Sequence, residues 1–312
     1  MNFFSTDTFL DALAAARFPG RRCQPVLVSV EGAVYRVLDV EGTAVTQVPF
    51  LDLLEPVADA APSGQRPLGW IPVALRGNVT LAEWRSAGAP PECEPCPYLR
   101  WADYPATWDE AAQRLPHGSD IRRKQRKLEG EVGPPRYVGD DPDPAALRLC
   151  LEWKSHQYRA TGHLDQFADP RNVALFERLR DAGALVVSSL YAGERLAAVH
   201  LGVADEGRFL SWIPAYDASL QKYSPGRILQ HRMMEDRFRR GDREFDFLIG
   251  DEEYKYHYAT HVRIAGPVGT PPLSLRARRA AKGVARAALQ GTGLLGGAKQ
   301  LKRWLRERAQ AR

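Results

Sequence analysis

The sequence predicts an α+β protein. From Pro144 onward the patterns run in the order helix, helix, three antiparallel strands, helix, strand, short helix and strand. The three strands, "ALVVSSL", "RLAAVHLGVA" and "RFLSWIPA", are joined by short turns at "AG" and "DEGR", which is typical of an antiparallel meander. Few folds run such a meander directly into a strand–helix–strand crossover, so the order itself is informative. A content of 44% hydrophobic and 26% charged residues is that of an ordinary globular protein.

The chain before this region begins with a helix and continues with strands. The helix is expected over Thr8 to Arg17, and the strands are "PVLVSVEG", "AVYRVLDVEG" and "TAVTQVPFLDL". The Pro- and Gly-rich stretch "EPVADAAPSGQRPLG" then predicts an exposed loop. A short strand is expected from Tyr98 to Trp101.

Helices are expected next, and their ends carry clear signals. "TWDEAAQRLPHGSDIRRKQRKLEGEVG" predicts two helical pieces, the second capped by Asp120. The helix that follows Pro144 should stop at Gly162. In the next helix Asp169 is a good cap, Pro170 a good first-turn residue, and Gly183 a good terminator.

The net charge of +5 is unevenly distributed along the chain. Residues 275–312 contain eleven Lys or Arg and one acid, a net charge of +10, so the remaining 32 basic and 37 acidic residues give −5. The basic tail can form amphipathic helices that contact anionic lipid through Leu301, Trp304 and Leu305. The alternative is a loosely packed basic appendage. The basic pI therefore says little about what the body of the protein binds.

Composition also favours a cytoplasmic protein, with peripheral contact at the inner face of the membrane as an option. No apolar run approaches the ~20 residues that cross a bilayer. Asp7 and Asp11 interrupt the N-terminal apolar segment, which argues against a signal peptide. Four cysteines are too few for a disulfide scaffold, and the lone C-x-x-C of Cys93 and Cys96 lacks a second ligand pair, so no metal is expected.

The junction "KYSPGRIL", Lys222 to Leu229, is the clearest candidate for a ligand-binding motif. A helix N-terminus presents unpaired N–H groups and partial positive charge, which suit phosphate. Gly226 permits close approach of a ligand to the backbone, and Arg227 adds a formal charge. The simpler interpretation is an ordinary helix start capped by Ser224.

His200 and a basic helix are two further candidates. Strand alternation puts His200 on one face with small residues, where it could serve as a general base, although a buried structural histidine is the commoner case. The run "IRRKQRKLE" could contact the phosphates of a cofactor or an RNA, but such a charged helix face is more often only solvated.

In chain order, "PYLRW", the helix led by Trp108, "RRKQRKLEGEVG", "AGERLAAVHLG", "YSPGRILQ" and "FDFLIGDEEYK" resemble the GNAT acyltransferase superfamily. The closest resemblance is to its FemAB-like branch, including the CelD/BcsL-type proteins associated with cellulose and other polysaccharide biosynthesis. It extends over Pro97 to Thr260 and implies a GNAT fold, with a mixed central sheet flanked by helices. The implied domains are a degenerate GNAT-like N-terminal half (1–105), packed in tandem with a GNAT-like acyltransferase domain (106–270), and a basic tail (271–312).

The resemblance also implies how a donor would be bound. Acetyl-CoA or another acyl-CoA would supply the acyl group, with the pantetheine arm held by Trp212, Ile213 and Pro214 where the strand splays from its neighbour. The residues implied for the CoA pyrophosphate are Tyr223, Ser224, Pro225, Gly226, Arg227, Ile228 and Leu229. Ile228 stands where the family signature often has a second small residue. FemAB-like members share that looser pattern and some of them use aminoacyl-tRNA, so the donor stays open.

The same resemblance assigns catalytic roles around "FDFLIGDEEYKYHYAT". His200 or Asp246 would act as base and Tyr254 as acid, while Asp251 and Lys255 would shape the acceptor pocket. Alternatively, Asp251 and Lys255 simply pair with each other across one helical turn. Phe245 and Phe247 are expected to face the core, with Asp246 turned toward the groove beside the donor strand.

The expected function is transfer of an acyl group to an amine or hydroxyl group of a small-molecule or glycan-precursor acceptor. One rival is a FemAB-type ligase that uses aminoacyl-tRNA, with Arg122 to Lys127 contacting the tRNA. A second rival is a non-catalytic GNAT-like scaffold at a membrane synthase.

Overall fold

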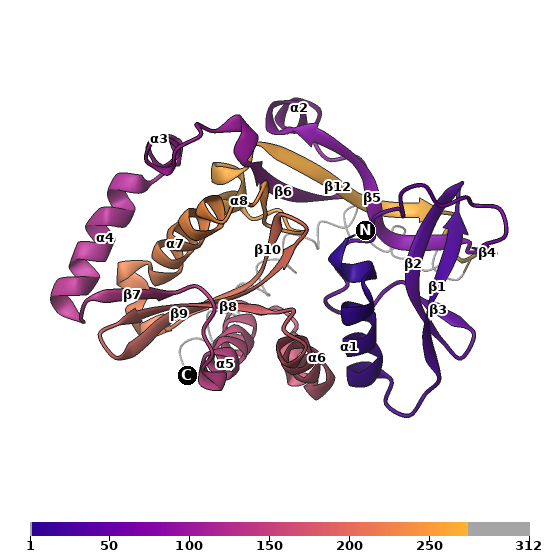
Figure 1. Cartoon of the computed structure of the whole chain (residues 1–312), viewed down its shortest axis with the longest axis horizontal. Helices are drawn as coiled ribbons and strands as arrows, with labels where there is room; N and C mark the ends of the chain where they lie inside the picture. Colours follow the sequence, from indigo (N-terminus) through magenta and orange to yellow (C-terminus); the bar gives the residue numbers. More distant parts are fainter. Residues whose placement is uncertain (1, 274–312) are drawn as a thin grey trace, which may run out of the picture.

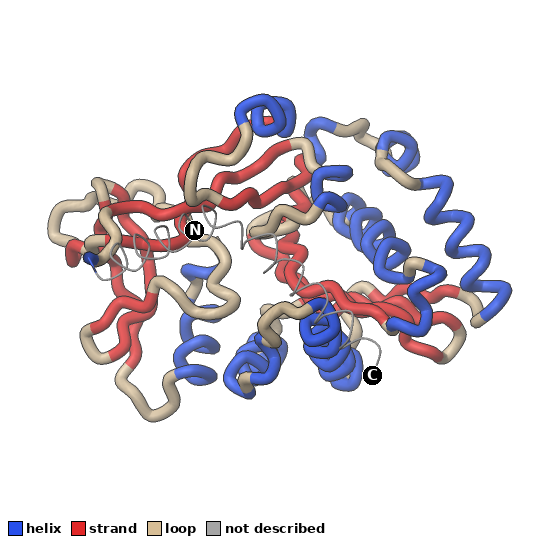
Figure 2. Tube along the Cα trace, turned by 180° about the vertical axis from the view of Figure 1, so that it is seen from behind, coloured by secondary structure: helices blue, strands red, loops and turns tan. Residues whose placement is uncertain are grey.

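The structure is a computed structural model that describes residues 2–273, and it confirms the predicted α+β class (Figures 1 and 2). The strands are β1 (Cys23–Val30), β2 (Ala33–Val40), β3 (Thr43–Val45), β4 (Arg66–Pro67), β5 (Trp70–Thr80), β6 (Glu94–Arg100), β7 (Pro135–Val138), β8 (Val186–Ala192), β9 (Arg195–Asp205), β10 (Arg208–Tyr216), β11 (Glu244–Asp246) and β12 (His261–Gly269). The α-helices are α1 (Asp7–Arg17), α2 (Leu81–Ala87), α3 (Trp108–Arg114), α4 (Gly118–Glu131), α5 (Pro144–Thr161), α6 (Pro170–Asp181), α7 (Pro225–Arg239) and α8 (Glu253–Tyr258). The 3-10 helices are η1 (Phe3–Ser5), η2 (Trp101–Asp103), η3 (Gln166–Ala168) and η4 (Ala218–Tyr223).

The main sheet has eight strands in the order β5-β12-β6-β11-β10-β9-β8-β7, and a second sheet has the order β3-β2-β1-β4. In the main sheet every neighbouring pair is antiparallel except β10 and β11, which are parallel. The predicted meander of β8, β9 and β10 is confirmed. Because β5 and β6 come from the early part of the chain, the main sheet crosses the domain boundary expected between residues 105 and 106.

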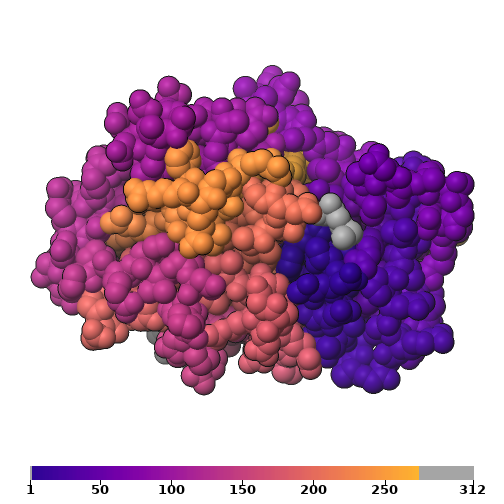
Figure 3. Space-filling model, viewed as in Figure 1, coloured from indigo at the N-terminus to yellow at the C-terminus, as the bar shows by residue number. Residues whose placement is uncertain are grey.

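Helices cover both faces of the β7–β10 part of the sheet. Figure 1 shows α7 on one face and α5 and α6 on the other. Alternation along β9 follows this arrangement: Ala198 packs with α7 residues, whereas Val199 and Leu201 pack in the core that includes α5 and α6. Helix α1 packs against α6, so the N-terminal residues lie directly on the middle of the chain, as the space-filling view shows (Figure 3).

An aromatic cluster around Trp212 anchors the N-terminal part of the chain to β10. The Trp212 ring lies 4.9–6.5 Å, between centroids, from five phenylalanine rings. These are Phe3, Phe4, Phe9, Phe50 and Phe176. Such tilted and edge-on pairs each stabilise the packing by about 0.5–1.5 kcal/mol beyond burial of their area. The cluster therefore attaches the first 50 residues of the chain to strand β10.

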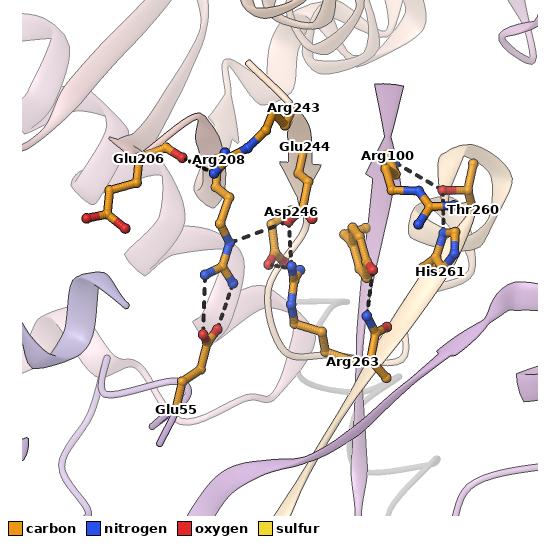
Figure 4. A network of polar contacts seen from close by, with 12 residues as sticks. Glu55, Arg100, Glu206, Arg208, Arg243, Glu244, Asp246, Thr260, His261 and Arg263 are labelled. Atoms are coloured by element: carbon orange, nitrogen blue, oxygen red, sulfur yellow. Dashed lines mark hydrogen bonds and ion pairs between the residues drawn. The ribbon is translucent and has the colours of Figure 1, made fainter. Parts of the chain in front are cut away.

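A second connection is ionic and runs through two arginines (Figure 4). Arg208 Nη2 donates to Glu55 Oε1 over 2.6 Å, and its Nε lies 3.4 Å from Glu244 Oε2. Arg263 donates to Glu244 and, over 2.8 Å, to Asp246 Oδ2. Burial lowers the pKa of Arg263, but the Asp246 and Glu244 carboxylates outweigh it and raise that pKa above its usual value. The network thus links the segment after β3 to β10, β11 and β12.

Two of the predicted helix ends are confirmed and a third is wrong. Asp169 caps α6 by accepting from the Arg171 amide, and α5 ends at Gly162 in the left-handed region, as predicted. Asp120, however, does not cap α4. The helix begins two residues earlier, preceded by His117 with φ of 66°, and Asp120 instead pairs with Arg123.

The predicted strand "TAVTQVPFLDL" is also mostly wrong, and four of the strands and α-helices were not predicted. Only Thr43–Val45 forms a strand, because Pro49 cannot donate to a ladder and Phe50 has φ of 67°. The rest of this segment crosses toward β10. Strands β4, β5 and β7 and helix α2 have no counterpart in the sequence-based prediction, and β4 lies in the stretch predicted as a loop.

The predicted basic tail, residues 271–312, lies almost wholly outside the described residues, and so does its predicted lipid contact. Among residues 2–273, no helix combines the length and hydropathy of a membrane span.

We expect Gly202→Ala to lower the free energy of unfolding by about 1–3 kcal/mol, since overpacking a well-packed core costs this much. A Cβ atom at Gly202 would contact the Phe209 ring and lie 2.8 Å from the Leu210 carbonyl oxygen. Urea or thermal unfolding measures the effect.

The matched control is Gly77→Ala in β5, where a Cβ atom has nothing within 4 Å. That variant should unfold within about 0.5 kcal/mol of the parent, as surface substitutions usually do. Equal stability of both variants would contradict the close packing at Gly202.

Candidate functional site

Strands β10 and β11 separate after a short pairing. Their parallel ladder covers only Arg208–Leu210 opposite Glu244–Asp246. Strand β10 then has an irregularity between Ser211 and Ile213 and continues beside β9 alone. The chain after β11 follows β6 instead, where the Phe247 amide donates to Pro97 O over 3.0 Å and the Gly250 amide to Pro95 O over 2.9 Å. The two strands therefore diverge at Trp212–Pro214, the place that the GNAT resemblance implied.

A cavity of about 460 Å³ lies at this separation, and we call it the β10–β11 cavity. Its walls come from β10, α5, the start of α7, the segment around α8, and the early residues Phe50 and Asp52. The predicted site residues that line it are Trp212, Ile213, Pro214, Gly226, Arg227, Tyr254 and Lys255. The sequence-based prediction missed Phe50, Asp52, Lys154, Gln157, Tyr158, Ser211, Gln230 and Glu252.

The start of α7 presents fewer ligand-binding groups than the motif implied. Ser224 has φ of 53° and its side chain makes no capping hydrogen bond, so its predicted role as cap is wrong. Pro225 has no N–H, and the amides of Arg227 and Ile228 donate to Ser224 O. Within the first turn, this leaves the Gly226 amide free for a ligand.

Three of the residues implied for the pyrophosphate face the protein interior instead. Ile228 and Leu229 are buried in the core beneath α7. Tyr223 is buried, and its hydroxyl group donates to Glu131 Oε2 over 2.7 Å. The side chains of these residues are therefore structural.

His200 is buried between β9 and α7, and its Nε2 lies 2.8 Å from Ser211 Oγ. Burial lowers the pKa of His200 to about 3, with smaller contributions from Lys154 and Arg237. The imidazole is thus neutral and a weak proton acceptor at pH 7. Its predicted role as general base does not fit this environment.

Asp246 is also unsuited to the predicted role of base. It is 1% exposed, and both carboxylate oxygens are occupied, one by Arg263 and the other by the Leu248 amide at 2.8 Å. Phe245 and Phe247 face the core as predicted, but Asp246 turns to Arg263 rather than to the groove. A carboxylate held in this way is structural.

The residues around α8 divide between the cavity and its surroundings. Tyr254 lines the cavity with 37% of the residue exposed, and partial desolvation, followed by the Glu252 carboxylate, raises the pKa of its hydroxyl group above the usual value. Lys255 is buried, donates to Ile249 O over 2.8 Å and pairs with Glu252 at 2.9 Å. Asp251 accepts from the Tyr256 hydroxyl group at 2.6 Å, so the alternative pairing of Asp251 with Lys255 is wrong.

Asp52 is the principal ionisable group that the prediction missed. It is half-buried in the cavity wall. Burial raises the pKa of its carboxyl group to about 6, an effect opposed by the Trp212 indole and by Lys255. A carboxyl group with that pKa is ionised at pH 7 and is a stronger base than an exposed aspartate. The available sequence signal was an isolated acid between Leu51 and Leu53.

Lys154 is a second group that the prediction missed. It lies on α5, and burial lowers the pKa of its ammonium group. Its nitrogen lies 5.3 Å from the centre of the Tyr158 ring, within cation–π range. A lysine at helical spacing from Leu147 and Leu151, on an otherwise apolar face, was the signal for it.

The basic helix α4 borders the start of α7. Lys124 Nζ donates to Lys222 O over 2.6 Å, and Arg227 Nη1 lies 3.6 Å from Asp120 Oδ2. Arg122 and Arg126 are exposed on α4. Positive charge is therefore available next to the cavity. Within residues 2–273, no three His, Cys, Asp or Glu side chains gather as a metal site would require.

Comparisons with known proteins agree with this geometry. Residues 117–256 match the family model described as acetyltransferase (GNAT) domain. No curated protein matches the sequence. Among solved structures, FemX is similar with a TM-score of 0.53 and 10% identity, over 86% of this chain and 91% of that one.

Another similar structure is the C-terminal domain of a protein described as a lysylphosphatidylglycerol synthetase from Agrobacterium fabrum. Its TM-score is 0.48 at 10% identity, over 91% of this chain and 95% of that one. The family match and the similarity to FemX confirm the predicted fold: a mixed sheet flanked by helices, with two strands that diverge at its centre. The chain therefore has the GNAT fold.

Proposed function

We propose that this protein transfers an acyl group from a CoA thioester to an amine or hydroxyl group. The observation that carries the proposal is the divergence of β10 from β11 at a cavity of about 460 Å³. Beyond Leu210, β10 has no strand partner on its β11 side. Its peptide groups there are available to the amide groups of a pantetheine arm, which needs hydrogen-bond donors and acceptors along its length. The match of residues 117–256 to a GNAT domain supports the same activity.

Asp52 is the base in this proposal. The lone pair of the acceptor nitrogen or oxygen attacks the thioester carbonyl carbon, and the acceptor's proton passes to the Asp52 carboxylate, directly or through a water molecule. Asp52 replaces His200 and Asp246 in this role because it alone of the three lines the β10–β11 cavity and has a pKa close to neutrality. Exposed backbone amides of β10 would stabilise the oxyanion that forms.

Tyr254 is the acid, as the resemblance implied. When the tetrahedral intermediate collapses, the C–S bond breaks and the thiolate of CoA takes the tyrosine hydroxyl proton. Its pKa lies above the usual value of about 10, so Tyr254 carries its proton at neutral pH, and the tyrosinate left after the transfer regains a proton from solvent. The products are the acylated acceptor and free CoA.

The remaining polar groups of the cavity are available to the acceptor. Lys154 and Gln157 project from α5, and Glu252 lies beside Lys255 on the opposite wall. Small amines, amino sugars and glycan precursors all carry groups that such a wall can hydrogen-bond, and they form the first acceptor panel to assay.

Aminoacyl-tRNA is a second candidate donor, favoured by two observations. The first turn of α7 offers a ligand only the Gly226 amide, fewer than a phosphate-binding helix start usually provides. Helix α4 contacts Lys222, just before that turn, and carries the exposed Arg122 and Arg126; such positive charge suits a polynucleotide. In that case the ester-linked aminoacyl group would enter the same cavity.

Acetyl-CoA should raise the melting temperature of the full chain, because a ligand that binds only the folded state stabilises it by mass action. Gly226→Phe should abolish that shift and the heat of binding in calorimetry, since its ring would fill the approach to the first turn of α7. Gly226→Ala is the matched control: its Cβ would lie 3.5 Å from Tyr216 Cδ1, an ordinary contact, and binding should persist.

Unchanged affinity in Gly226→Phe would place the donor elsewhere. If no CoA compound shifts the melting temperature while aminoacyl-tRNA does, in a salt-sensitive way, the second donor is correct. Failure of both classes would contradict acyl transfer at this cavity.

The rate of CoA release in the presence of an accepted amine should fall as the pH drops below about 6, where Asp52 becomes protonated. Asp52→Asn should reduce the rate of CoA release by about 10²–10⁴-fold and abolish its decrease below pH 6. The control Asp11→Asn, on the exposed face of α1, should keep both the rate and its decrease at low pH.

Stability gives an independent check on Asp52. Its pKa is raised from 3.8 to about 6 in the folded state, so the stability cost of ionising it develops as the pH rises from about 3.8 to about 6 and is complete above that. Asp52→Asn should therefore melt a few degrees higher than the parent at pH 8, and the difference should shrink below pH 6 and vanish well below pH 3.8. A variant that is less stable at pH 8 would show that Asp52 is structural.

A further inference from the structure

A side pocket of about 30 Å³ adjoins the β10–β11 cavity, and His200 helps to close it. The side pocket and the cavity have continuous walls, because six residues line both: Ser211, Pro214, Tyr216, Gly226, Gln230 and Tyr254. A water molecule occupies roughly 10–15 Å³ on this measure. The side pocket therefore has room for about two water-sized groups.

Two buried nitrogen atoms in its lining have no hydrogen-bond partner within residues 2–273. They are Nε2 of Gln230, on α7, and Nδ1 of His200, on β9. The amide nitrogen of Gln230 can only donate. Because an unpaired buried donor costs free energy, the side pocket favours an occupant that brings an acceptor atom.

The imidazole of His200 also limits which chemical group can occupy the side pocket. His200 is neutral, and its Nε2 shares one hydrogen bond with Ser211 Oγ at 2.8 Å. If Nε2 donates that bond, Nδ1 needs a donor; if Nε2 accepts it, Nδ1 needs an acceptor. A hydroxyl group meets either need while it also accepts from Gln230. An ammonium group cannot accept from Gln230, and a methyl group can do neither.

We propose that the side pocket receives the acyl group of the donor and selects a short acyl group that ends in a hydroxyl. The inference rests on the proposed function, which puts the thioester in the β10–β11 cavity within reach of Tyr254, a residue that also lines the side pocket. A hydroxymethyl group has two heavy atoms, which matches the space. The volume of about 30 Å³ leaves no room for a longer alkyl chain.

The test compares two acyl-CoA ligands of equal size, hydroxyacetyl-CoA and propionyl-CoA, which differ only by OH in place of CH₃. Calorimetry on the full chain without acceptor gives both dissociation constants, with free CoA as reference. We expect hydroxyacetyl-CoA to bind about tenfold more tightly than propionyl-CoA, which corresponds to ~1.4 kcal/mol. Octanoyl-CoA should bind no better than free CoA.

Gln230→Leu removes the donor at nearly constant volume and should bring the two dissociation constants within about twofold of each other. The matched control is Gln157→Leu, which changes a glutamine that lines the β10–β11 cavity but not the side pocket. It should leave the tenfold ratio intact even if it weakens both ligands.

Propionyl-CoA binding as tightly as hydroxyacetyl-CoA to the parent protein would overturn the inference, and so would a preference that survives Gln230→Leu. Either outcome leaves the proposed function standing, because CoA compounds would still bind. If free CoA and every acyl-CoA fail to bind, the proposed CoA donor is wrong, and this inference falls with it.

Discussion

Strands β10 and β11 pair over three residues and then diverge, and the packing around Trp212 keeps them apart. A sheet gains hydrogen bonds by closing such a gap, so an open one needs compensation. Here the irregularity at Ser211–Ile213 turns β10 away from its partner, and phenylalanine rings from η1, α1 and the segment after β3 pack against the Trp212 ring. The cavity, the exposed peptide groups and the position of Asp52 all follow from this one arrangement.

The network of ion pairs beside the cavity holds β10 and β11 together where the two strands are still paired. Arg208 and Arg263 join Glu55, Glu244 and Asp246 just where β10 and β11 still pair. Buried ion pairs are costly to desolvate and add little net stability, but they disfavour alternative packings in which a charge would be left alone. In this protein they fix the point at which the two strands stop pairing. Asp246 therefore belongs to the contacts that hold the paired ends of β10 and β11 in place.

The sequence predicted the fold better than the site, and the reason is physical. Helix ends such as Asp169 and Gly162 depend on local hydrogen bonds and backbone angles, which neighbouring residues determine. The roles of His200 and Asp246 depend on burial and on partners far along the chain, so their residue types alone were misleading. Asp52 was missed because its segment resembles a strand until Pro49 and Phe50 divert it into the cavity. The resemblance to GNAT proteins correctly located the divergence at Trp212–Pro214, since backbone geometry there is a property of the fold.

The order of the main sheet has a consequence for how the chain is made. Strand β6 lies between β11 and β12, and β5 pairs with β12 at the edge of the sheet. Strands β5 and β6 therefore cannot form these pairs during synthesis until residues 244–269 have left the ribosome. Pairings so distant in sequence close large loops and form slowly, and unpaired strand edges are open to intermolecular association meanwhile. Strand β12 is thus the element whose arrival completes the main sheet.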